Sequence, residues 1–222
     1  MIFRNSLFLF SLLYPLHSIF LTKRAKEKRD KRGINLFILT PFSPFLFYTL
    51  SLDFPFYLRF MQNIAIRIIE PGDNKTLATI VRNTLAEFGA NHPGTVYYDP
   101  TTDALYELFQ KKGSIYYVGE LNGELIGGAG IYPSDGLPEG TCELVKMYLL
   151  PKARGLGLGK TLIDKVLAFA KDSGYKNVYI ETMPELKQAM KVYEKFGFRY
   201  LDGPMGNTGH TGCEVWMLLK LE

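Results

Sequence analysis

Arg154-Gly155-Leu156-Gly157-Leu158-Gly159-Lys160 is the stretch of sequence that decides the fold. It stands between the apolar run 142–150 and the helical pattern 162–170, so a strand, a glycine-rich turn and a helix are expected to follow one another. The first N–H groups of a helix have no partner within the helix and carry the positive end of its dipole, and glycines let an anion approach them. The stretch therefore predicts a phosphate-binding loop.

The spacing of the glycines distinguishes three kinds of phosphate loop. A P-loop needs G-x-x-x-x-G-K-[ST], but Arg154 occupies the position of its first glycine. A dinucleotide fingerprint needs G-x-G-x-x-G, which fails from Gly155 and from Gly157. The spacing R-x-x-G-x-G fits at Arg154, Gly157 and Gly159, and it resembles the acetyl-CoA pyrophosphate loop of the GNAT superfamily of N-acetyltransferases.

Two flanking segments carry the same resemblance. Residues 143–151, E-L-V-K-M-Y-L-L-P, resemble the strand that leads into the loop, and residues 193–198, Y-E-K-F-G-F, resemble the family's late Y-E-K-x-G-F signature. The resemblance covers residues 64–220 and implies an α/β (α+β) fold, a mixed, mostly antiparallel sheet flanked by helices on both faces in the order β-α-α-β-β-β-α-β-α-β-β. It also implies an enzyme that moves an acetyl group from acetyl-CoA to a primary amine of a small molecule or protein, by direct attack in a ternary complex.

Residue patterns predict the individual elements. Alternating isoleucines predict a strand at 64–68, Asp73 is expected to cap the following helix, and a second helix is expected over 102–111. Asn122-Gly123 predicts a tight hairpin between strands 115–120 and 124–132. The other expected elements are a strand over 142–150, a helix that Gly174 ends, a strand over 177–182, a helix from Pro184 to Gly197, and strands over 198–201 and 213–219.

The resemblance implies a cofactor-binding role for seven residues. It places the pyrophosphate at the loop and the pantetheine arm along the preceding strand, where a backbone N–H near Met147 faces the thioester carbonyl and Leu149 pairs with the arm. The seven residues are Met147, Leu149, Arg154, Gly155, Gly157, Gly159 and Lys160. For Arg154 the alternative is a solvated loop arginine. The family's frequent asparagine seven residues before the signature tyrosine is Leu186 here, so the resemblance does not extend to the side-chain contact that this asparagine makes with the arm.

Two further residues are candidates for the proton transfers. Tyr193 matches the tyrosine that can return a proton to the CoA thiolate, and its alternative role is that of a core aromatic. Glu143 stands where some family members hold a glutamate that deprotonates the amine, and its alternative is a structural carboxylate paired with Lys146 or a sheet neighbour. A chain of water molecules that accepts the proton of the amine is an alternative to Glu143 as the base.

Two loops are expected to select the acceptor. They are the segments 92–98 and 203–210, which contain His92 and His210. Histidines and tyrosines in such loops could bind an acceptor or tune an amine, although a turn-rich surface loop explains them equally well. Neither loop carries an acidic cluster of the kind that would point to polyamines or aminoglycosides.

Residues 1–60 differ in composition from residues 61–222. The first segment holds 11 of the 16 phenylalanines and a net charge of +6, whereas the remainder has a net charge of −2. The net positive charge of the whole chain therefore gives no argument that the 61–222 domain binds nucleic acid. The interpretation favoured for 1–60 is a start codon assigned too early, ahead of Met61. A membrane anchor broken by prolines and a disordered or targeting tail are the alternatives, whereas a signal peptide fits poorly.

Cys142 and Cys213 lie on separate predicted strands without metal-ligand spacing. They are expected to be free thiols of a cytoplasmic protein, and acetyl-CoA is expected to act without a metal. Two other functions stay open: a non-catalytic acyl-CoA sensor, and a membrane-tethered acyltransferase if residues 1–60 are genuine. Neither the acceptor, the length of the acyl group nor the oligomeric state, a homodimer included, follows from the sequence.

Overall fold

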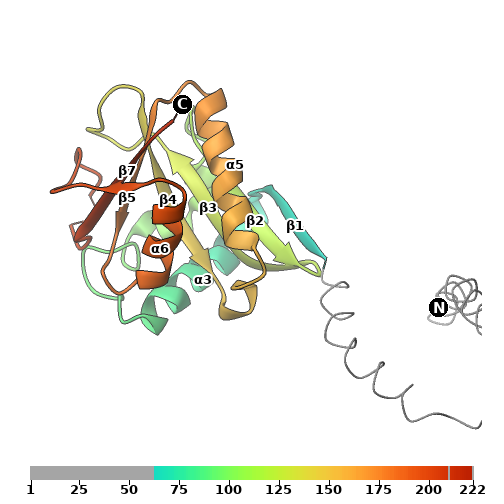
Figure 1. Ribbon diagram of the computed structural model, residues 1–222. Coiled ribbons are helices and arrows are strands. Elements are labelled where there is room, and N and C mark those ends of the chain that lie inside the picture. The colour runs from blue at the N-terminus through green and yellow to red at the C-terminus, as the bar shows by residue number, and fades with distance from the viewer. Residues whose placement is uncertain (1–62, 210, 222) are drawn as a thin grey trace, which may run out of the picture. The chain divides into compact units, whose positions relative to one another are not determined.

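The computed structural model describes residues 63–209 and 211–221, which form a seven-stranded sheet with helices on both faces (Figure 1). The strand order is β1-β2-β3-β4-β5-β7-β6. Neighbouring strands are antiparallel except β4 and β5, which are parallel. The expected fold class and element order are confirmed. The segment 1–60 and His210 lie outside the described residues, so the interpretations attached to them stay predictions.

The elements have the following bounds. The strands are β1 (Ile64–Ile68), β2 (Ile115–Leu121), β3 (Glu124–Tyr132), β4 (Thr141–Leu149), β5 (Asn177–Thr182), β6 (Arg199–Tyr200) and β7 (Val215–Lys220). The α-helices are α3 (Asn74–Glu87), α4 (Leu105–Leu108), α5 (Leu158–Asp172) and α6 (Lys187–Lys195). Short 3-10 turns are η1 (Pro71–Asp73), η2 (Pro100–Asp103) and η3 (Pro151–Ala153).

Three local expectations are corrected. The helix expected over 102–111 is only the single turn α4, because η2 precedes it and Asp99 caps η2 by accepting a hydrogen bond from Thr101 N at 2.8 Å. Helix α6 begins at Lys187 and not at Pro184, because a turn from Leu186 N to the Met183 carbonyl comes first.

Asp73 does stand at the N-cap of α3, but its carboxylate does not bond that helix. Arg67 donates to it at 2.7 and 2.9 Å and Glu70 N at 2.8 Å, so Asp73 ties β1 to the start of α3 instead.

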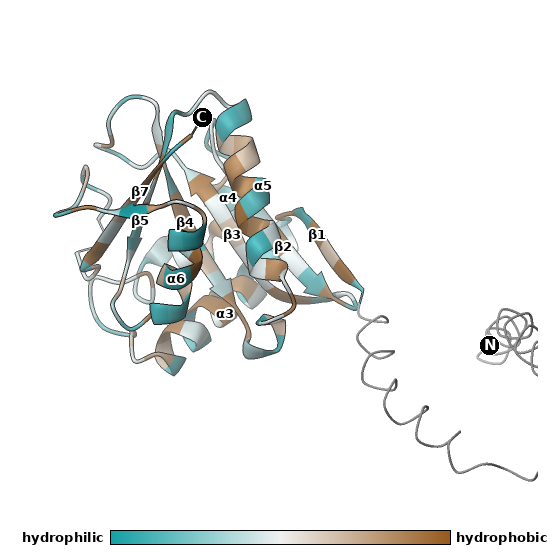
Figure 2. Ribbon diagram, in the orientation of Figure 1, coloured by the Kyte–Doolittle hydropathy of each residue, from teal (hydrophilic) through white to brown (hydrophobic). Residues whose placement is uncertain are grey.

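Helices α5 and α3 cover opposite faces of the sheet. The largest core cluster joins Leu162, Ile163 and Val166 of α5 to Ile126 of β3 and Val178 of β5. The other face packs on α3 through the clusters that contain Leu77, Val81 and Leu85. Helix α6 lies on the α5 side, and Figure 2 shows it mainly hydrophilic on the side away from the sheet.

Strand β4 changes its alternation at Lys146. Cys142 and Leu144 pack in the α5-side core, but after Lys146 the residues on that side are Met147 and Leu149. The cause is a bulge against β3, where the register moves from Gly130↔Val145 to Gly128↔Tyr148, and Lys146 adopts a φ of 52°. The bulge brings Met147 to the side of α6.

The ladder between β4 and β5 is short. It runs from Thr141↔Asn177 to Glu143↔Tyr179 and ends there, although both strands continue. The continuing parts of β4 and β5 border a cavity, described below. Within 63–209 and 211–221, no helix is long and apolar enough to cross a membrane.

Candidate active site

A cavity of about 700 Å³ lies where β4 and β5 separate, and it is bordered by α3, α6 and the start of α5. This volume is in the range of small-molecule sites. All nine residues that were predicted to bind the cofactor or to transfer protons line the cavity: Glu143, Met147, Leu149, Arg154, Gly155, Gly157, Gly159, Lys160 and Tyr193. The fold thus brings together residues that are up to fifty positions apart along the chain.

The glycine loop leads directly into α5. Gly155 and Gly157 have φ values of 75° and 83°, which favour glycine, and an added Cβ at either position would meet open space. The first bond of the α5 ladder runs from Thr161 N to the Gly157 carbonyl at 3.1 Å. The backbone N–H groups of 158–160 precede that bond, so this end of the cavity offers helix N-terminal donors to an anion.

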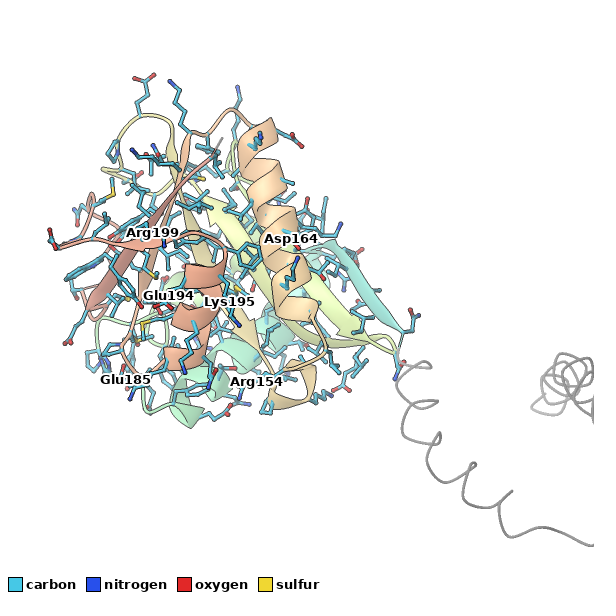
Figure 3. All side chains as sticks on the ribbon, viewed as in Figure 1. Arg154, Asp164, Glu185, Glu194, Lys195 and Arg199 are labelled. Atoms are coloured by element: carbon cyan, nitrogen blue, oxygen red, sulfur yellow. The ribbon has the colours of Figure 1, made fainter. Side chains whose placement is uncertain are left out.

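Arg154 directs its guanidinium toward α3. It forms two hydrogen bonds to the Glu87 carboxylate, at 2.5 and 2.7 Å, donates to the Leu149 carbonyl at 3.1 Å, and lies 5.1 Å from the centre of the Phe88 ring. The hydrogen bonds from Arg154 lower the pKa of Glu87. Figure 3 shows Arg154 between α3 and the loop before α5. The side chain therefore borders the cavity while it braces the loop against α3.

Tyr193 projects from α6 to the bulge of β4. Its hydroxyl donates to the Met147 sulfur at 3.8 Å, and the side chain is 5% exposed. Burial raises the pKa of this phenol, so Tyr193 carries its proton at neutral pH. A protonated hydroxyl thus stands beside the strand segment that was predicted to face a thioester.

Glu143 is the last β4 residue of the β4–β5 ladder and is 1% exposed. The Ser134 hydroxyl donates a hydrogen bond to its Oε2. Glu143 points to the face opposite Leu144, which packs on the α5 side, whereas Tyr193 belongs to the α5-side core. The carboxylate and the phenol consequently border the cavity from opposite sides of the sheet.

Lys146 is a buried cation at the bulge. Its Nζ donates to Asp99 Oδ2 at 2.7 Å and to Thr102 Oγ1 at 3.4 Å, while its carbonyl accepts from the Tyr116 hydroxyl at 2.8 Å. Burial lowers the pKa of Lys146 by more than the charge of Asp99 raises it. The sequence suggested Lys146 as a partner for Glu143, but the ion pair that holds its ammonium is with Asp99.

Comparison with known proteins assigns the family. Residues 81–198 match the family model for the acetyltransferase (GNAT) family. The chain is 41% identical over 167 residues to the uncharacterized N-acetyltransferase YjgM of Escherichia coli K12, a match that covers 72% of this chain and 100% of YjgM. The chain belongs to the GNAT family of acetyltransferases. Membership makes it an acyl-CoA-dependent N-acyltransferase.

Solved GNAT structures share the fold. An acetyltransferase of the GNAT family from Staphylococcus aureus Mu50 aligns with a TM-score of 0.64 at 19% identity, covering 72% of this chain and 100% of that one. YncA of Salmonella typhimurium, solved with acetyl-CoA, aligns with a TM-score of 0.56 at 22% identity, covering 72% and 95% of the two chains.

The cavity fits the parts of an acyl-CoA that a GNAT protein binds. The α5 N-terminus suits a pyrophosphate, and apolar residues such as Ala189 and Val192 of α6 border the path toward Tyr193. Thr84 of α3 also lines the cavity and is 6% exposed. Among the residues described, its Oγ1 is the buried side-chain oxygen for which the structure shows no hydrogen-bond partner, so an amide group of the pantetheine arm could satisfy it.

Thr84 and Glu181 are two of the cavity residues that the sequence did not indicate. Thr84 gave no signal, because it is one of several threonines in an amphipathic helix. Glu181 was not predicted either. It stands near the end of the apolar strand β5, where a single carboxylate among apolar residues was the signal that could have indicated a functional residue. His92 was a candidate acceptor contact, but it does not line this cavity, and its Nδ1 lies 3.3 Å from the Pro93 carbonyl.

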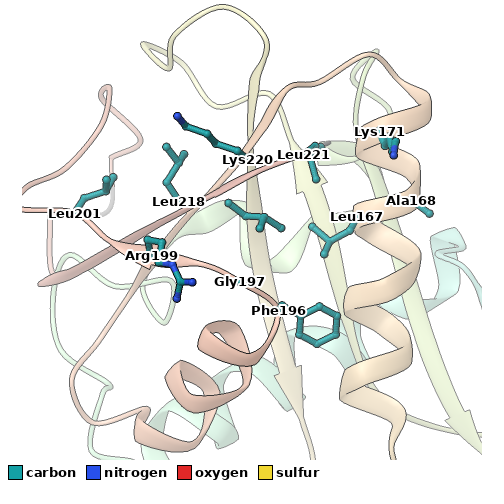
Figure 4. A pocket seen from close by; sticks show the side chains of 11 residues that line it. Leu167, Ala168, Lys171, Phe196, Gly197, Arg199, Leu201, Leu218, Lys220 and Leu221 are labelled. Atoms are coloured by element: carbon teal, nitrogen blue, oxygen red, sulfur yellow. The ribbon is translucent and has the colours of Figure 1, made fainter.

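A separate surface hollow lies between the end of α5 and β7 (Figure 4). Most of its lining residues are apolar, but Lys171, Arg199 and Lys220 also line it. None of the nine predicted residues is part of this hollow. Across 63–209 and 211–221, no three His, Cys, Asp or Glu side chains are grouped to hold a metal ion.

Proposed function

We propose that the chain transfers the acetyl group of acetyl-CoA to a primary amine, by direct attack within a ternary complex. Acetyl-CoA supplies the activated acyl group as a thioester. A bond forms between the amine nitrogen and the carbonyl carbon while the carbon–sulfur bond breaks. The amine loses a proton and the thiolate gains one, so the products are an amide and the free thiol of CoA.

The chain's own groups are proposed to have four roles. The N–H groups at the start of α5 bind the pyrophosphate, and the Met147 N–H donates to the carbonyl oxygen. Glu143 accepts the proton that the amine loses, and Tyr193 donates a proton to the sulfur. The observation that carries this assignment is the position of the protonated, buried Tyr193 hydroxyl beside Met147, in the same cavity as Glu143.

Glu143 and Tyr193 border the cavity from opposite faces of the sheet, which suits a reaction with two substrates. An acceptor that approaches on the Glu143 side can attack a thioester whose sulfur lies on the Tyr193 side. The two proton transfers then occur at separate ends of the reacting centre, and neither substrate has to leave before the other binds. This arrangement supports direct transfer.

Replacing Tyr193 by Phe tests the proposal. We expect kcat to fall on the order of a hundredfold, the lower range for loss of a general acid, while the Kd for acetyl-CoA stays the same. Tyr200→Phe is the matched control, because Tyr200 is 54% exposed and its hydroxyl bonds Glu194 instead of the cavity. Unchanged turnover in Tyr193→Phe would contradict the acid role, and a chain that binds acetyl-CoA but acetylates no amine would be a sensor.

We also infer that the protein works in a reducing compartment such as the cytoplasm. Cys142 and Cys213 are both free and buried, and burial raises the pKa of each thiol to about 12. Such thiols are inert at neutral pH. Cell fractionation with an antibody against the domain would test this localisation.

A further inference from the structure

Three loops meet on the Glu143 side of the sheet. Gly212 N donates to the Gly94 carbonyl at 2.9 Å, and Asn207 N donates to the Asp135 carbonyl at 3.1 Å. The loops before η2, after β3 and before β7 are thereby joined, and residues of all three line a second pocket of about 450 Å³ beside the first cavity. The first and the last are the two loops that the sequence indicated for acceptor selection.

An apolar wall borders the first cavity on this side. Val96 comes from the loop before η2, Tyr148 from β4 and Met183 from the residue after β5, and all three are buried and line the cavity. They belong to one core cluster, which also contains Val81 of α3. The apolar wall therefore lies on the α3 face of the sheet, which is the face to which the proposed base, Glu143, also points.

Hydrogen bonds fix both ends of the apolar wall. The Val96 carbonyl accepts from the buried Thr102 hydroxyl at 2.8 Å and from Asp99 N at 3.3 Å. At the other end, Leu186 N donates to the Met183 carbonyl at 3.0 Å and closes the turn that follows β5. The backbone thus sets the positions of these side chains, so the apolar wall is formed before a ligand binds, as is usual for small-molecule sites.

Tyr148 brings a hydroxyl to this wall. Within 63–209 and 211–221 the structure shows no hydrogen-bond partner for the hydroxyl, which opens onto the cavity and so differs from the enclosed Thr84 Oγ1. A buried tyrosine hydroxyl usually has a partner, because a missing hydrogen bond costs free energy. The Tyr148 hydroxyl is therefore suited to bind a molecule that occupies the cavity.

The Tyr148 hydroxyl also lies near the proposed reacting centre. Burial raises the pKa of the phenol, and the nearby Cys213 and Tyr193, which line the same cavity, raise it further. Tyr193 is the proposed proton donor to the sulfur, and its hydroxyl bonds Met147. Tyr193 belongs to the α5-side cluster and Tyr148 to the α3-side cluster. The two phenols thus approach the opening between β4 and β5 from the two faces of the sheet.

We propose that the acceptor is a primary amine with an apolar body, which packs on Val96 and Met183 while the Tyr148 hydroxyl accepts a hydrogen bond from its nitrogen. This inference rests on the proposed transfer reaction and adds the chemical class of its acceptor. The hydrogen bond holds the nitrogen at the opening, where the thioester is expected. Each methylene group of the body gains free energy when it leaves water for the apolar wall.

The first arm of the test is a series of straight-chain primary amines from ethylamine to hexylamine. Release of the CoA thiol from acetyl-CoA by the full-length chain is the readout. We expect kcat/KM to rise about threefold to fourfold with each added methylene until the apolar wall is covered. The matched control is the diamine that carries an ammonium group in place of the terminal methyl of hexylamine, because the two chains have the same length. Its kcat/KM should be lower by at least about tenfold.

Replacing Tyr148 by Phe tests the hydroxyl, because the variant keeps the ring and with it the apolar wall. We expect kcat/KM for hexylamine to fall about threefold to tenfold and the Kd for acetyl-CoA to stay the same. The free energy of unfolding should stay the same or increase. Tyr175→Phe is the matched control, because Tyr175 does not line the cavity and its hydroxyl bonds the Gly113 carbonyl at 2.9 Å. It should lower the stability and leave kcat/KM unchanged.

Val96→Thr tests the apolar wall with a side chain of the same shape that carries a hydroxyl. We expect the ratio of kcat/KM for hexylamine to that for ethylamine to fall about threefold to tenfold. Both amines are measured on the same preparation, so this ratio does not depend on how much of the variant folds.

The outcomes separate the two proposals. Equal or better turnover of the diamine, no rise along the amine series, or an unchanged ratio in Val96→Thr would overturn the apolar acceptor. An unchanged kcat/KM for hexylamine in Tyr148→Phe would overturn the role of the hydroxyl. In each of these cases the transfer reaction stands. If acetyl-CoA binds but no amine is acetylated, the transfer reaction itself is refuted, and this inference with it.

Discussion

Thr84 places a hydroxyl on the cavity side of α3, where the structure shows it no partner within the described chain. A buried polar group without a hydrogen bond costs about 1–3 kcal/mol, so such a group calls for an explanation. We propose that an amide group of the pantetheine arm of acetyl-CoA forms the missing hydrogen bond in the complex. Thr84 would then stabilise the complex although it weakens the ligand-free protein.

Replacing Thr84 by Val tests that explanation. The variant keeps the shape of the side chain and removes the hydroxyl, so we expect the Kd for acetyl-CoA to rise about fivefold to tenfold, which corresponds to about 1 kcal/mol. The free energy of unfolding of the ligand-free protein should stay the same or increase. Calorimetric titration and urea unfolding measure the two quantities.

Thr79→Val is the control for this prediction, because Thr79 is exposed on the same helix and bonds the Lys75 carbonyl. It should leave the Kd unchanged. If Thr84→Val binds acetyl-CoA as tightly as the unaltered protein, the Thr84 hydroxyl does not contact the ligand.

Single residues differ in how far the sequence predicts them. Gly157 and Tyr193 stand in spaced motifs, so their place in one cavity could be expected from a family resemblance. The place of Glu181 in the cavity could not be predicted, because it depends on the separation of β4 from β5 after Glu143, which is a property of tertiary structure. A pyrophosphate contact was predicted for Arg154 and stays a prediction, whereas its ion pair with Glu87 could not be predicted, because it depends on how α3 packs against the loop.

At the scale of elements, the bulge in β4 divides the site into its two sides. Before Lys146, odd-numbered Glu143 and Val145 point away from α5, and after it, odd-numbered Met147 and Leu149 point toward the α5-side core. Without the extra residue, Met147 would stay on the side of Glu143. The ion pair between Lys146 and Asp99 joins this bulge to η2, and so to the loops of the second pocket.

The pair predicts a loss of stability in acid. Burial alone would raise the pKa of Asp99, but the charge of Lys146 and the hydrogen bonds from Lys146 and Thr101 outweigh it, so the folded-state pKa lies below the ordinary value of 3.8. As the pH falls, Asp99 is therefore protonated in the unfolded chain before it is protonated in the folded protein. The contribution of the ion pair to the free energy of unfolding is present above pH 3.8 and is lost as the pH falls below this value.

Asp99→Asn should accordingly reduce the free energy of unfolding at neutral pH by about 2 kcal/mol, because Lys146 loses its buried partner. The stability difference between the variant and the unaltered protein should shrink between about pH 4 and about pH 2. Urea unfolding across this range measures it. Asp202→Asn, an exposed aspartate, serves as the control and should track the unaltered protein. A constant difference at every pH would refute the ion-pair explanation.

Elements whose ends depend on local chemistry were predictable. Asn122-Gly123 turns the β2–β3 hairpin with φ values of 53° and 82°, and Gly174 and Gly197 end their helices with φ values of 84° and 93°. The bulge was not predictable, because a lysine with positive φ follows no local preference and is held by contacts from Tyr116 and Asp99. The shortened α4 likewise reflects the cap formed by Asp99, which the helical pattern of 102–111 concealed.

At the scale of the whole molecule, the proposed reaction would use both faces of the sheet. The described domain presents the α5 N-terminus and Tyr193 on one side of the β4–β5 opening, and Glu143 with the three joined loops on the other. Element order and family could be predicted from the glycine loop and its flanks. The second pocket could not, since it forms where three loops far apart in sequence meet.

The central claim is that the glycine loop before α5 binds the pyrophosphate of acetyl-CoA. Gly157 and Gly174 provide a matched pair for testing it, because they stand at the two ends of α5 with φ values of 83° and 84°, and an added Cβ meets no atom within 4 Å at either position. Leucine should cost about 1–2 kcal/mol of backbone strain at either position. Of these two glycines, Gly157 lines the cavity and Gly174 does not.

Calorimetric titration of acetyl-CoA into the full-length chain, Gly157→Leu and Gly174→Leu is therefore the most direct measurement. The prediction is that one acetyl-CoA binds per chain, that Gly174→Leu retains the affinity and that Gly157→Leu loses it. Equal binding by both variants, or no binding by the folded unaltered protein, would contradict the claim.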